Sequence, residues 1–495
     1  MTAAAHLPAL QVALPLIAAP ICTLLRWRPA AWAFATAVTW VAFAVSIFLL
    51  MHVQDHGTWS YELGGWAPPW GIEYRVDLVS AYVLLIVSGI AAVVTPFARQ
   101  SIDQEIPADR HHFFYSAWLL CITGLLGMTI TGDAFNLFVF LEISSLSTYV
   151  LVASGSDRRA LTAAYQYLVM GTLGATFYII GVGLIYMMTG TLNIADMAER
   201  LPPILSTAPI RAAAGFITVG IGLKFALFPL HLWLPNAYTY APSAVSALLA
   251  ATATKVAIYV LVRLEFIIFG PSLGGDSLTF SHILMPLAVI GFLTASVVAI
   301  FQDNVKRLLA YSSVAQIGYI VLGISFVSVT GLTAGLVHLF NHALIKGALF
   351  LVLACVMLRI GSVRLEDMAG AGKRMPWTMF AFVIGGLSLI GVPLTVGFIS
   401  KWYLILAALE RGTLGIVIAG LVLVSSLLAV IYVWRVVEVA YFRPPPENAK
   451  AVTEAPLAML IPTWILVVAN IYFGLDTDFT VGVAQSAATF LLGSP

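Results

Sequence analysis

Four lysines and one glutamate lie inside long apolar stretches of the sequence, where charged side chains are rare. They are Glu142, Lys224, Lys255, Lys346 and Lys401. A lysine at the centre of a membrane helix costs roughly 2.5–3.5 kcal/mol on insertion scales, so it is retained only where it faces protein or water. Amines and carboxylates bind and release protons, and we therefore expect these groups to line a path for protons. The alternative is that each lysine reaches an interface or forms a structural pair.

One apolar segment, GLVHLFNHALIKGALF, adds two histidines to this set. His338, His342 and Lys346 are spaced at i, i+4 and i+8, so one helix face carries all three over roughly 12 Å. Neutral imidazole both donates and accepts hydrogen bonds, which suits a relay between waters. Packing histidines bonded to carbonyl groups are the alternative. Zinc is disfavoured because no third ligand and no H-E-x-x-H motif accompanies the pair.

A further expectation concerns the contact between Glu142 and Lys224. The segment FNLFVFLEISSLSTYVLV places serines and a threonine directly after Glu142, so its helix has a polar face turned inward. If Lys224 contacts the carboxylate, the coupled pair can exchange a proton when its surroundings change. A purely structural ion pair is the alternative. Further relay candidates are His231, Ser145 and Thr252.

Membrane helices must hold these residues, because the composition is far outside the soluble range. The chain has 495 residues, of which 61% are hydrophobic and 9% charged. A membrane span needs about 20 mostly apolar residues. Fourteen segments qualify: 8–25, 31–52, 76–97, 113–131, 133–153, 162–188, 211–240, 242–265, 282–302, 308–327, 331–358, 376–407, 414–440 and 455–474. We therefore predict an all-α polytopic membrane protein with about fourteen transmembrane helices.

Two of the predicted spans are interrupted. Pro229 and Pro235 fall within the seventh span, and Gly391, Pro393 and Gly397 fall within the twelfth. A broken membrane helix is tolerated only where protein or a wet cavity satisfies the freed backbone groups. Breaks at corresponding positions of two halves indicate inverted repeats. The predicted division is 1–112 (helices 1–3), 113–265 (first repeat, helices 4–8), 266–440 (second repeat, helices 9–13) and 441–495 (helix 14 and tail).

Charge and cysteine usage exclude several functions and suggest an orientation. A net charge of +1 provides no broad basic surface for nucleic acid. The three cysteines show no C-x-x-C spacing, so we expect no metal site and no cofactor. Cytoplasmic loops are enriched in basic residues. Fifteen basic residues lie after odd-numbered spans or at their ends, against five after even-numbered spans (Arg75, Arg200, Arg211, Arg263 and Arg411). Both termini are therefore expected outside the cytoplasm.

The segments quoted above, together with GLKFALFPLHLWLPNAYTYAPSAVSALLAATATKVAIY and GVPLTVGFISKW, resemble a known family. It is the family of antiporter-like membrane subunits shared by respiratory complex I, membrane-bound hydrogenases and multisubunit Mrp-type Na+/H+ antiporters. The resemblance covers most of the chain. Within the family, the FNLFVF segment before Glu142 and the chain length favour the D-type subunits of the Mrp antiporters.

The resemblance implies two inverted five-helix repeats, with broken helices 7 and 12, around a hydrated chain of polar residues. By position, Glu142 on helix 5 pairs with Lys224 on helix 7. Lys255 is then the linker on helix 8, and Lys401 is the terminal lysine on helix 12, where some relatives have glutamate. His338 and His342 then correspond to relay positions on helix 11.

The sequence thus predicts a proton-translocating subunit of a multisubunit monovalent cation (Na+)/H+ antiporter in the bacterial inner membrane. Such a chain is a secondary ion transporter and not an enzyme. Its expected partners are other membrane subunits of the complex, with protons moving on this chain and Na+ passing through the complex. One alternative is a proton-pumping subunit of a redox-driven complex. Another is a scaffold whose polar residues only hold helices together.

Overall fold

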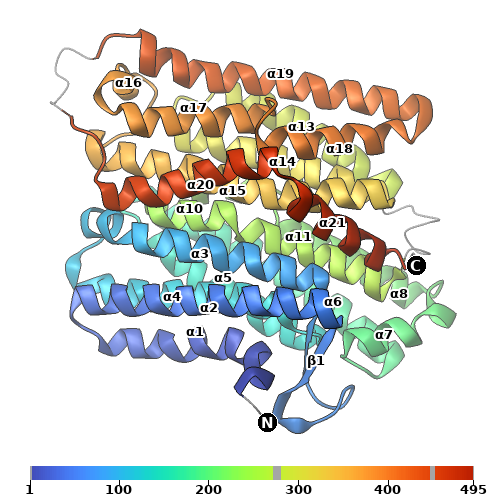
Figure 1. Ribbon diagram of the computed structural model, residues 1–495. Coiled ribbons are helices and arrows are strands. Elements are labelled where there is room, and N and C mark those ends of the chain that lie inside the picture. Colours follow the sequence, from blue (N-terminus) through green and yellow to red (C-terminus); the bar gives the residue numbers. More distant parts are fainter. Residues whose placement is uncertain (1–2, 271–279, 446–451, 494–495) are drawn as a thin grey trace.

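The computed structural model describes residues 3–270, 280–445 and 452–493. The long helices run side by side, from α1 at one edge of the bundle to α19 at the other (Figure 1). Within the described residues, twelve helical segments are long and apolar enough to cross a membrane. They contain α1 (Leu7–Leu24), α2 (Arg28–His56), α3 (Leu78–Glu105), α4 (His111–Ile130), α5 (Ala134–Ala153), α6 (Arg159–Thr189), α10 (Ser243–Ala251) with α11 (Ala253–Arg263), α13 (Met285–Ile300), α14 (Val305–Ser325), α15 (Val329–Ile360), α19 (Gly412–Phe442) and α20 (Leu457–Leu475).

Two further spans are broken in the middle. Helix α8 (Ala208–Lys224) leads to α9 (Trp233–Tyr240), and α17 (Pro376–Ile390) leads to α18 (Val396–Leu409). Each break contains a non-glycine residue in the left-handed region, Ala226 with φ 61° and Leu394 with φ 75°. A helix cannot continue through such a residue. The interruptions predicted from the proline and glycine pattern are confirmed, and the chain is the all-α polytopic membrane protein that its composition predicts.

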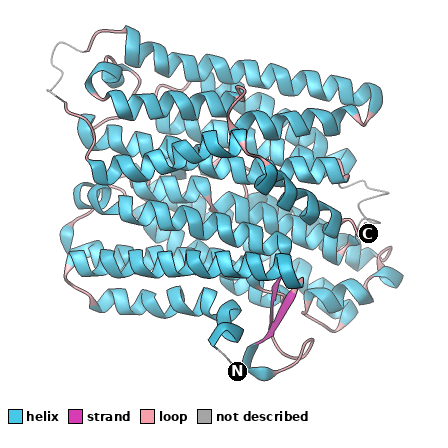
Figure 2. Ribbon diagram, viewed as in Figure 1, coloured by secondary structure: helices cyan, strands magenta, loops and turns pink. Residues whose placement is uncertain are grey.

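Smaller elements lie between and after the spans. Strands β1 (Trp59–Glu62) and β2 (Glu73–Val76) form an antiparallel hairpin (Figure 2). Each strand has four residues, too few for the apolar periodicity that reveals the helices. Three short helices are α7 (Ile194–Arg200), α16 (Ala371–Arg374) and α21 (Asp478–Leu491). Helix α21 packs against α15 and buries Ala484, Ala487 and Ala488.

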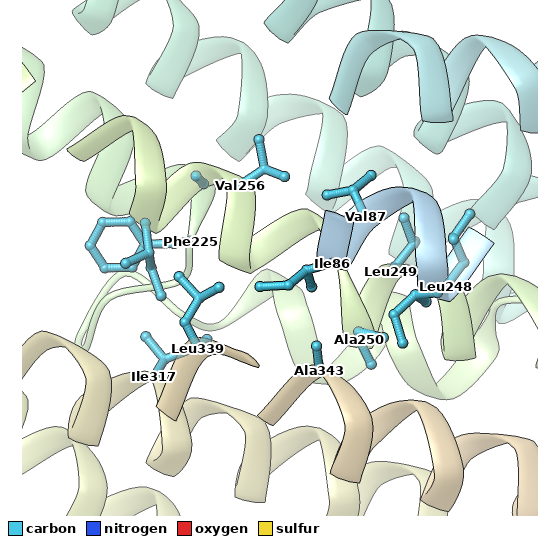
Figure 3. Close-up of a cluster of buried hydrophobic side chains, with 14 of the residues drawn as sticks. Ile86, Val87, Phe225, Leu248, Leu249, Ala250, Val256, Ile317, Leu339 and Ala343 are labelled. Atoms are coloured by element: carbon cyan, nitrogen blue, oxygen red, sulfur yellow. The ribbon is translucent and has the colours of Figure 1, made fainter. Parts of the chain in front are cut away.

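Helix α15 is the central element of the bundle. It packs against α3, α10, α14, α17, α18 and α20, and every residue from Gly331 to Val356 is buried. Figure 3 shows Leu339 and Ala343 of α15 in an apolar cluster with Ile317 of α14 and side chains of α3, α10 and α11. Polar residues of this stretch therefore face the protein interior and not lipid.

Candidate functional site

Lys224 is the last residue of α8, at the edge of the first break. Its Nζ atom lies 3.8 Å from Glu142 Oε1 and donates a 2.8 Å hydrogen bond to Ser145 Oγ. The lysine is buried, whereas the Glu142 side chain is 26% exposed. Glu142 and Ser145 lie one turn apart on α5 and so present a carboxylate and a hydroxyl to one amine. The predicted contact between Glu142 and Lys224 is thus present in the structure.

A cavity of about 30 Å³ adjoins this group. Its lining includes Ser145, Lys224, Ala253 and Ala257. A water molecule needs roughly 10–15 Å³ of such volume and polar partners, and the serine and lysine supply them. Because Ala253 and Ala257 lie on either side of Lys255 in α11, the cavity borders the helix that carries the next lysine.

Lys255 is fully buried where the eighth span bends. At Thr252 the backbone leaves helical geometry, with φ −126° and ψ −56°, and separates α10 from α11. Lys255 Nζ donates to the carbonyl oxygen of Ala250, and Thr254 Oγ1 lies 3.4 Å from the same atom. The Thr252 hydroxyl donates to Leu248 O at 2.7 Å. Thr252, one of the predicted relay residues, is therefore hydrogen-bonded within its own span.

The two histidines of α15 lie in a row, as their spacing predicts. The rings of His338 and His342 are nearly parallel, with centroids 6.2 Å apart. His338 Nδ1 shares a 2.7 Å hydrogen bond with Ser400 Oγ of α18. Both ring nitrogens of His342 and Nε2 of His338 are buried without a hydrogen-bond partner in the described part of the chain. Buried imidazole nitrogens are normally paired, so these three atoms keep unused hydrogen-bonding capacity in the described part of the chain.

Lys346 continues the row toward α14. Its Nζ donates to Leu309 O at 2.9 Å and to Ser312 Oγ. Lys346 and Lys255 both act electrostatically on His342. The imidazole of His342 is therefore near both the lysine of α11 and the lysine of α15.

Lys401 lies in α18, just after the second break, and its amine reaches back to the end of α17. Its Nζ donates to Leu389 O at 3.1 Å and to Ile390 O at 2.8 Å, and to Ser426 Oγ at 3.0 Å. Leu389 and Ile390 end α17, so the ammonium group caps the negative end of a half-helix. The same atom lies 5.1 Å from the ring centroid of Tyr319.

His231 is placed apart from these groups. Its ring stacks on Phe228 and meets Tyr311 edge-on. Within the described residues, no hydrogen bond or ion pair joins it to a buried lysine. The structure thus brings the predicted residues into two groups at the breaks and a central group on α11 and α15, and leaves His231 outside them.

Some buried polar residues are not predicted from the sequence. Asp77 and Arg263 form an ion pair in which neither side chain is more than 2% exposed. The assignment of Arg263 to a loop is wrong, because it lies within the span Ser243–Ile268. Glu265 is buried and accepts a 2.6 Å hydrogen bond from Thr218. Arg263 and Glu265 both lie in the apolar run IYVLVRLEFIIF, and this position is what could have indicated from the sequence that they are buried.

Comparisons with known proteins assign the chain to a family. The family described as NADH:quinone oxidoreductase/Mrp antiporter, TM matches residues 131–428. The chain is 42% identical over 491 residues to the N subunit of NADH-quinone oxidoreductase from Desulforudis audaxviator, covering 96% of each protein. It is 31% identical over 435 residues to the D subunit of the Na+/H+ antiporter from Alkalihalophilus pseudofirmus, covering 88% of this chain and 86% of the relative. The chain therefore belongs to the NADH:quinone oxidoreductase/Mrp antiporter transmembrane family.

The fold is similar to that of a chain in the Mrp complex of Dietzia sp. DQ12-45-1b. The TM-score is 0.90 at 26% identity, covering 99% of this chain and 98% of that one. Sequence identity is higher to the oxidoreductase relative than to the antiporter relative, so the D-type antiporter assignment predicted from the FNLFVF segment is not confirmed. The matched family region contains every predicted site residue, from Glu142 to Lys401.

Proposed function

We propose that this chain translocates protons across a membrane along the buried groups from Glu142 to Lys401. The supporting observation is that Lys255, Lys346 and Lys401 are buried with carbonyl and hydroxyl partners and, within the described residues, form no ion pair. A buried amine without a counter-ion is costly. Neutral side chains would join these helices without that cost, so the amines serve to bind and release protons.

The proposed route has three parts. Glu142, Ser145 and Lys224 form the group at the first break, where separation of the ion pair lets the amine release its proton. The central group on α11 and α15 passes the proton between amines through imidazole. His338, Ser400 and Lys401 form the group at the second break. Na+ prefers oxygen ligands, whereas the titratable side chains of this row are, apart from Glu142, amines and imidazoles, so its cargo is the proton.

We further propose that the chain works in a redox-driven complex of the NADH-quinone oxidoreductase type. The 42% identity to the oxidoreductase relative supports this assignment over the 31% identity to the antiporter relative. A multisubunit Na+/H+ antiporter is the second candidate, supported by the TM-score of 0.90 to a chain of an Mrp complex. The subunits that co-purify with the chain distinguish the two. Iron–sulfur or flavin subunits indicate the first, and small membrane subunits alone indicate the second.

The proposed setting is the bacterial inner membrane, with both termini outside the cytoplasm. Of the basic residues on which this orientation rests, Lys450 lies outside the described residues. The breaks belong to two inverted repeats, 113–265 and 266–440. Leu232 and Leu394 are 68% and 66% exposed beside the two breaks, and such apolar exposure suits lateral contact with neighbouring subunits. The isolated chain should therefore show little ion exchange.

Substitutions at the first break test the proposal in the assembled complex. Glu142→Gln and Lys224→Ala should abolish proton translocation into sealed vesicles, while Lys373→Ala, at an exposed lysine of α16, should leave it unchanged. Assembly is checked by co-purification of the partner subunits. Wild-type translocation by correctly assembled Lys224→Ala complexes would leave only the scaffold function.

A further inference from the structure

A second buried lysine site lies at one end of the bundle, away from the residues discussed above. Lys306, in the first turn of α14, is only 3% exposed. Its Nζ donates to Ser243 Oγ at 2.9 Å and to Ala241 O at 3.3 Å, at the junction between α9 and α10. No ion pair of Lys306 occurs among the described residues. This lysine is therefore a buried amine held by neutral groups, like those of the proposed route.

A carboxylate connects this lysine to the surface. Glu105, the last residue of α3, is half-buried. Its Oε1 and Oε2 atoms accept hydrogen bonds from Ser243 N at 3.2 Å and 2.9 Å, and Ser101 Oγ donates to Oε1 at 2.6 Å. Ser243 therefore bonds Glu105 through its backbone and Lys306 through its hydroxyl. Glu105 is also the charged group that acts on Lys306 electrostatically.

Helix α14 carries the connection inward. The two acceptors of Lys346 are Leu309 O and Ser312 Oγ, which follow Lys306 by three and six residues. At 1.5 Å per residue they lie about 4.5 and 9 Å further along the helix axis. The extended side chain of a lysine reaches roughly 6 Å from its Cα atom, so the Lys306 amine can swing toward Leu309 O, the nearer acceptor of Lys346. One helix therefore carries Lys306 and also holds the amine of the central group.

We propose that Glu105, Ser243 and Lys306 form the proton-uptake path from this end of the bundle to Lys346. This inference rests on the proton-translocating function proposed above. Glu105 takes a proton from water as a carboxylic acid and passes it to the free amine of Lys306, which passes it to Lys346. The first transfer, from water to the Glu105 carboxylate, breaks one O–H bond and forms another. Each later transfer breaks one O–H or N–H bond and forms one N–H bond, so only a proton moves. Arg110 and Arg158 follow odd-numbered spans at this same end, which the proposed orientation assigns to the cytoplasm.

The other charged groups nearby do not replace this path. Arg307 lies over the ring of Tyr311, and Arg159 lies over Tyr240 and pairs with Asp157. Arginine cannot release a proton in a protein. Lys306 is thus the one described group at this junction that combines burial, a nearby carboxylate and the ability to lose a proton.

The path is tested by measuring proton translocation in sealed vesicles that contain the assembled complex. Lys306→Gln removes the transferable proton, and Lys306→Arg keeps the positive charge but cannot release one. Both should lower translocation by at least about tenfold, within the range attributed to positioned proton-transfer groups. Glu105→Gln keeps acceptor oxygen for Ser243 N but cannot carry a proton, and should also lower the rate. Glu438→Gln, at a partly exposed carboxylate paired with Arg443 near the same end, is the matched control and should keep the wild-type rate.

The arginine variant separates proton transfer from a structural role. Wild-type translocation by Lys306→Arg or by Glu105→Gln would overturn the path. If Lys306 variants fail to assemble, Ser243→Ala serves instead, because it removes the hydroxyl contact to Lys306 and keeps the backbone donor to Glu105. A wild-type rate for Ser243→Ala would equally contradict the proposal. Lys224→Ala is measured alongside: if it alone abolishes translocation, the uptake path fails while the proposed function stands.

Discussion

Replacing Gly397 with alanine should disrupt the lysine site at the second break. A Cβ atom at Gly397 would lie 1.7 Å from the carbonyl oxygen of Ser388, whereas real Cβ contacts are essentially never below 3.0 Å. The first turn of α18 must therefore move away from the end of α17 by more than 1 Å. Lys401 lies one turn after Gly397, and its acceptors directly follow Ser388 in the chain. The displacement thus acts on the hydrogen bonds that hold the ammonium group.

The size of the effect follows from these hydrogen bonds. Lys401 Nζ donates to Leu389 O at 3.1 Å and to Ile390 O at 2.8 Å. A shift of this size takes both beyond hydrogen-bonding distance, and each hydrogen bond to a charged group contributes about 1.5–3 kcal/mol. Loss of both removes about 3 kcal/mol or more, and every 1.4 kcal/mol is a factor of ten. We expect proton translocation to fall by about two orders of magnitude.

The assay compares two alanine variants in assembled complexes. Gly420→Ala in α19 is the matched control, because a Cβ atom there meets nothing within 4 Å, and alanine favours a helix. Its translocation in sealed vesicles should equal that of the wild type. Equal rates for Gly397→Ala and Gly420→Ala, with equal co-purification of partner subunits, would refute the reasoning about Lys401.

Three further predictions concern other parts of the chain. Asp77→Ala leaves Arg263 as an unpaired buried charge, which costs about 3–5 kcal/mol, so the unfolding temperature should drop by several degrees; an unchanged temperature would contradict this. Ser400→Ala removes the hydrogen bond to His338 and should reduce translocation by about tenfold without loss of assembly, which co-purification checks. Burial raises the pKa of Asp133, whose carboxylate caps α5. When the pKa of a carboxyl group is higher in the folded protein, the stability present at low pH is lost as the pH rises through that folded-state pKa. Asp133→Asn should therefore become more stable to heat than the wild type above about pH 4. A difference in unfolding temperature that stays constant with pH would argue against this.

Residue type and spacing predict much of the site because charged groups in apolar sequence have few permitted positions. They single out Glu142 and Lys224, the family resemblance implies that the two pair, and the structure shows them in contact. The acceptor of Lys255 is beyond such prediction. It is a carbonyl freed by a bend at Thr252, where neither proline nor glycine marks the sequence. Every residue has a backbone carbonyl group, so the sequence does not indicate which carbonyl will accept a hydrogen bond from a lysine. Only the folded structure shows it.

The fold shows the same contrast between local and long-range information. Hydrophobic length predicts the spans, and proline and glycine predict the breaks, because both are properties of neighbouring residues. The ion pair of Asp77 and Arg263 joins residues 186 positions apart, and sequence spacing says nothing about such contacts. The same holds for Lys306. It lies between two predicted spans, which predicts an exposed side chain, but the packing of α14 against α9 and the contact with Ser243 of α10 bury it.

The central claim is that the buried amines are kept for proton transfer and not for stability. Lys255→Met tests it most directly, because methionine preserves the length of the side chain and removes a fully buried charge that has no ion-pair partner among the described residues. Replacing such a charge with an apolar side chain is often neutral or stabilising. The paired measurement is thermal stability and proton translocation of the assembled Lys255→Met complex. We predict unchanged or higher stability with translocation lost; lower stability with translocation retained would contradict the account.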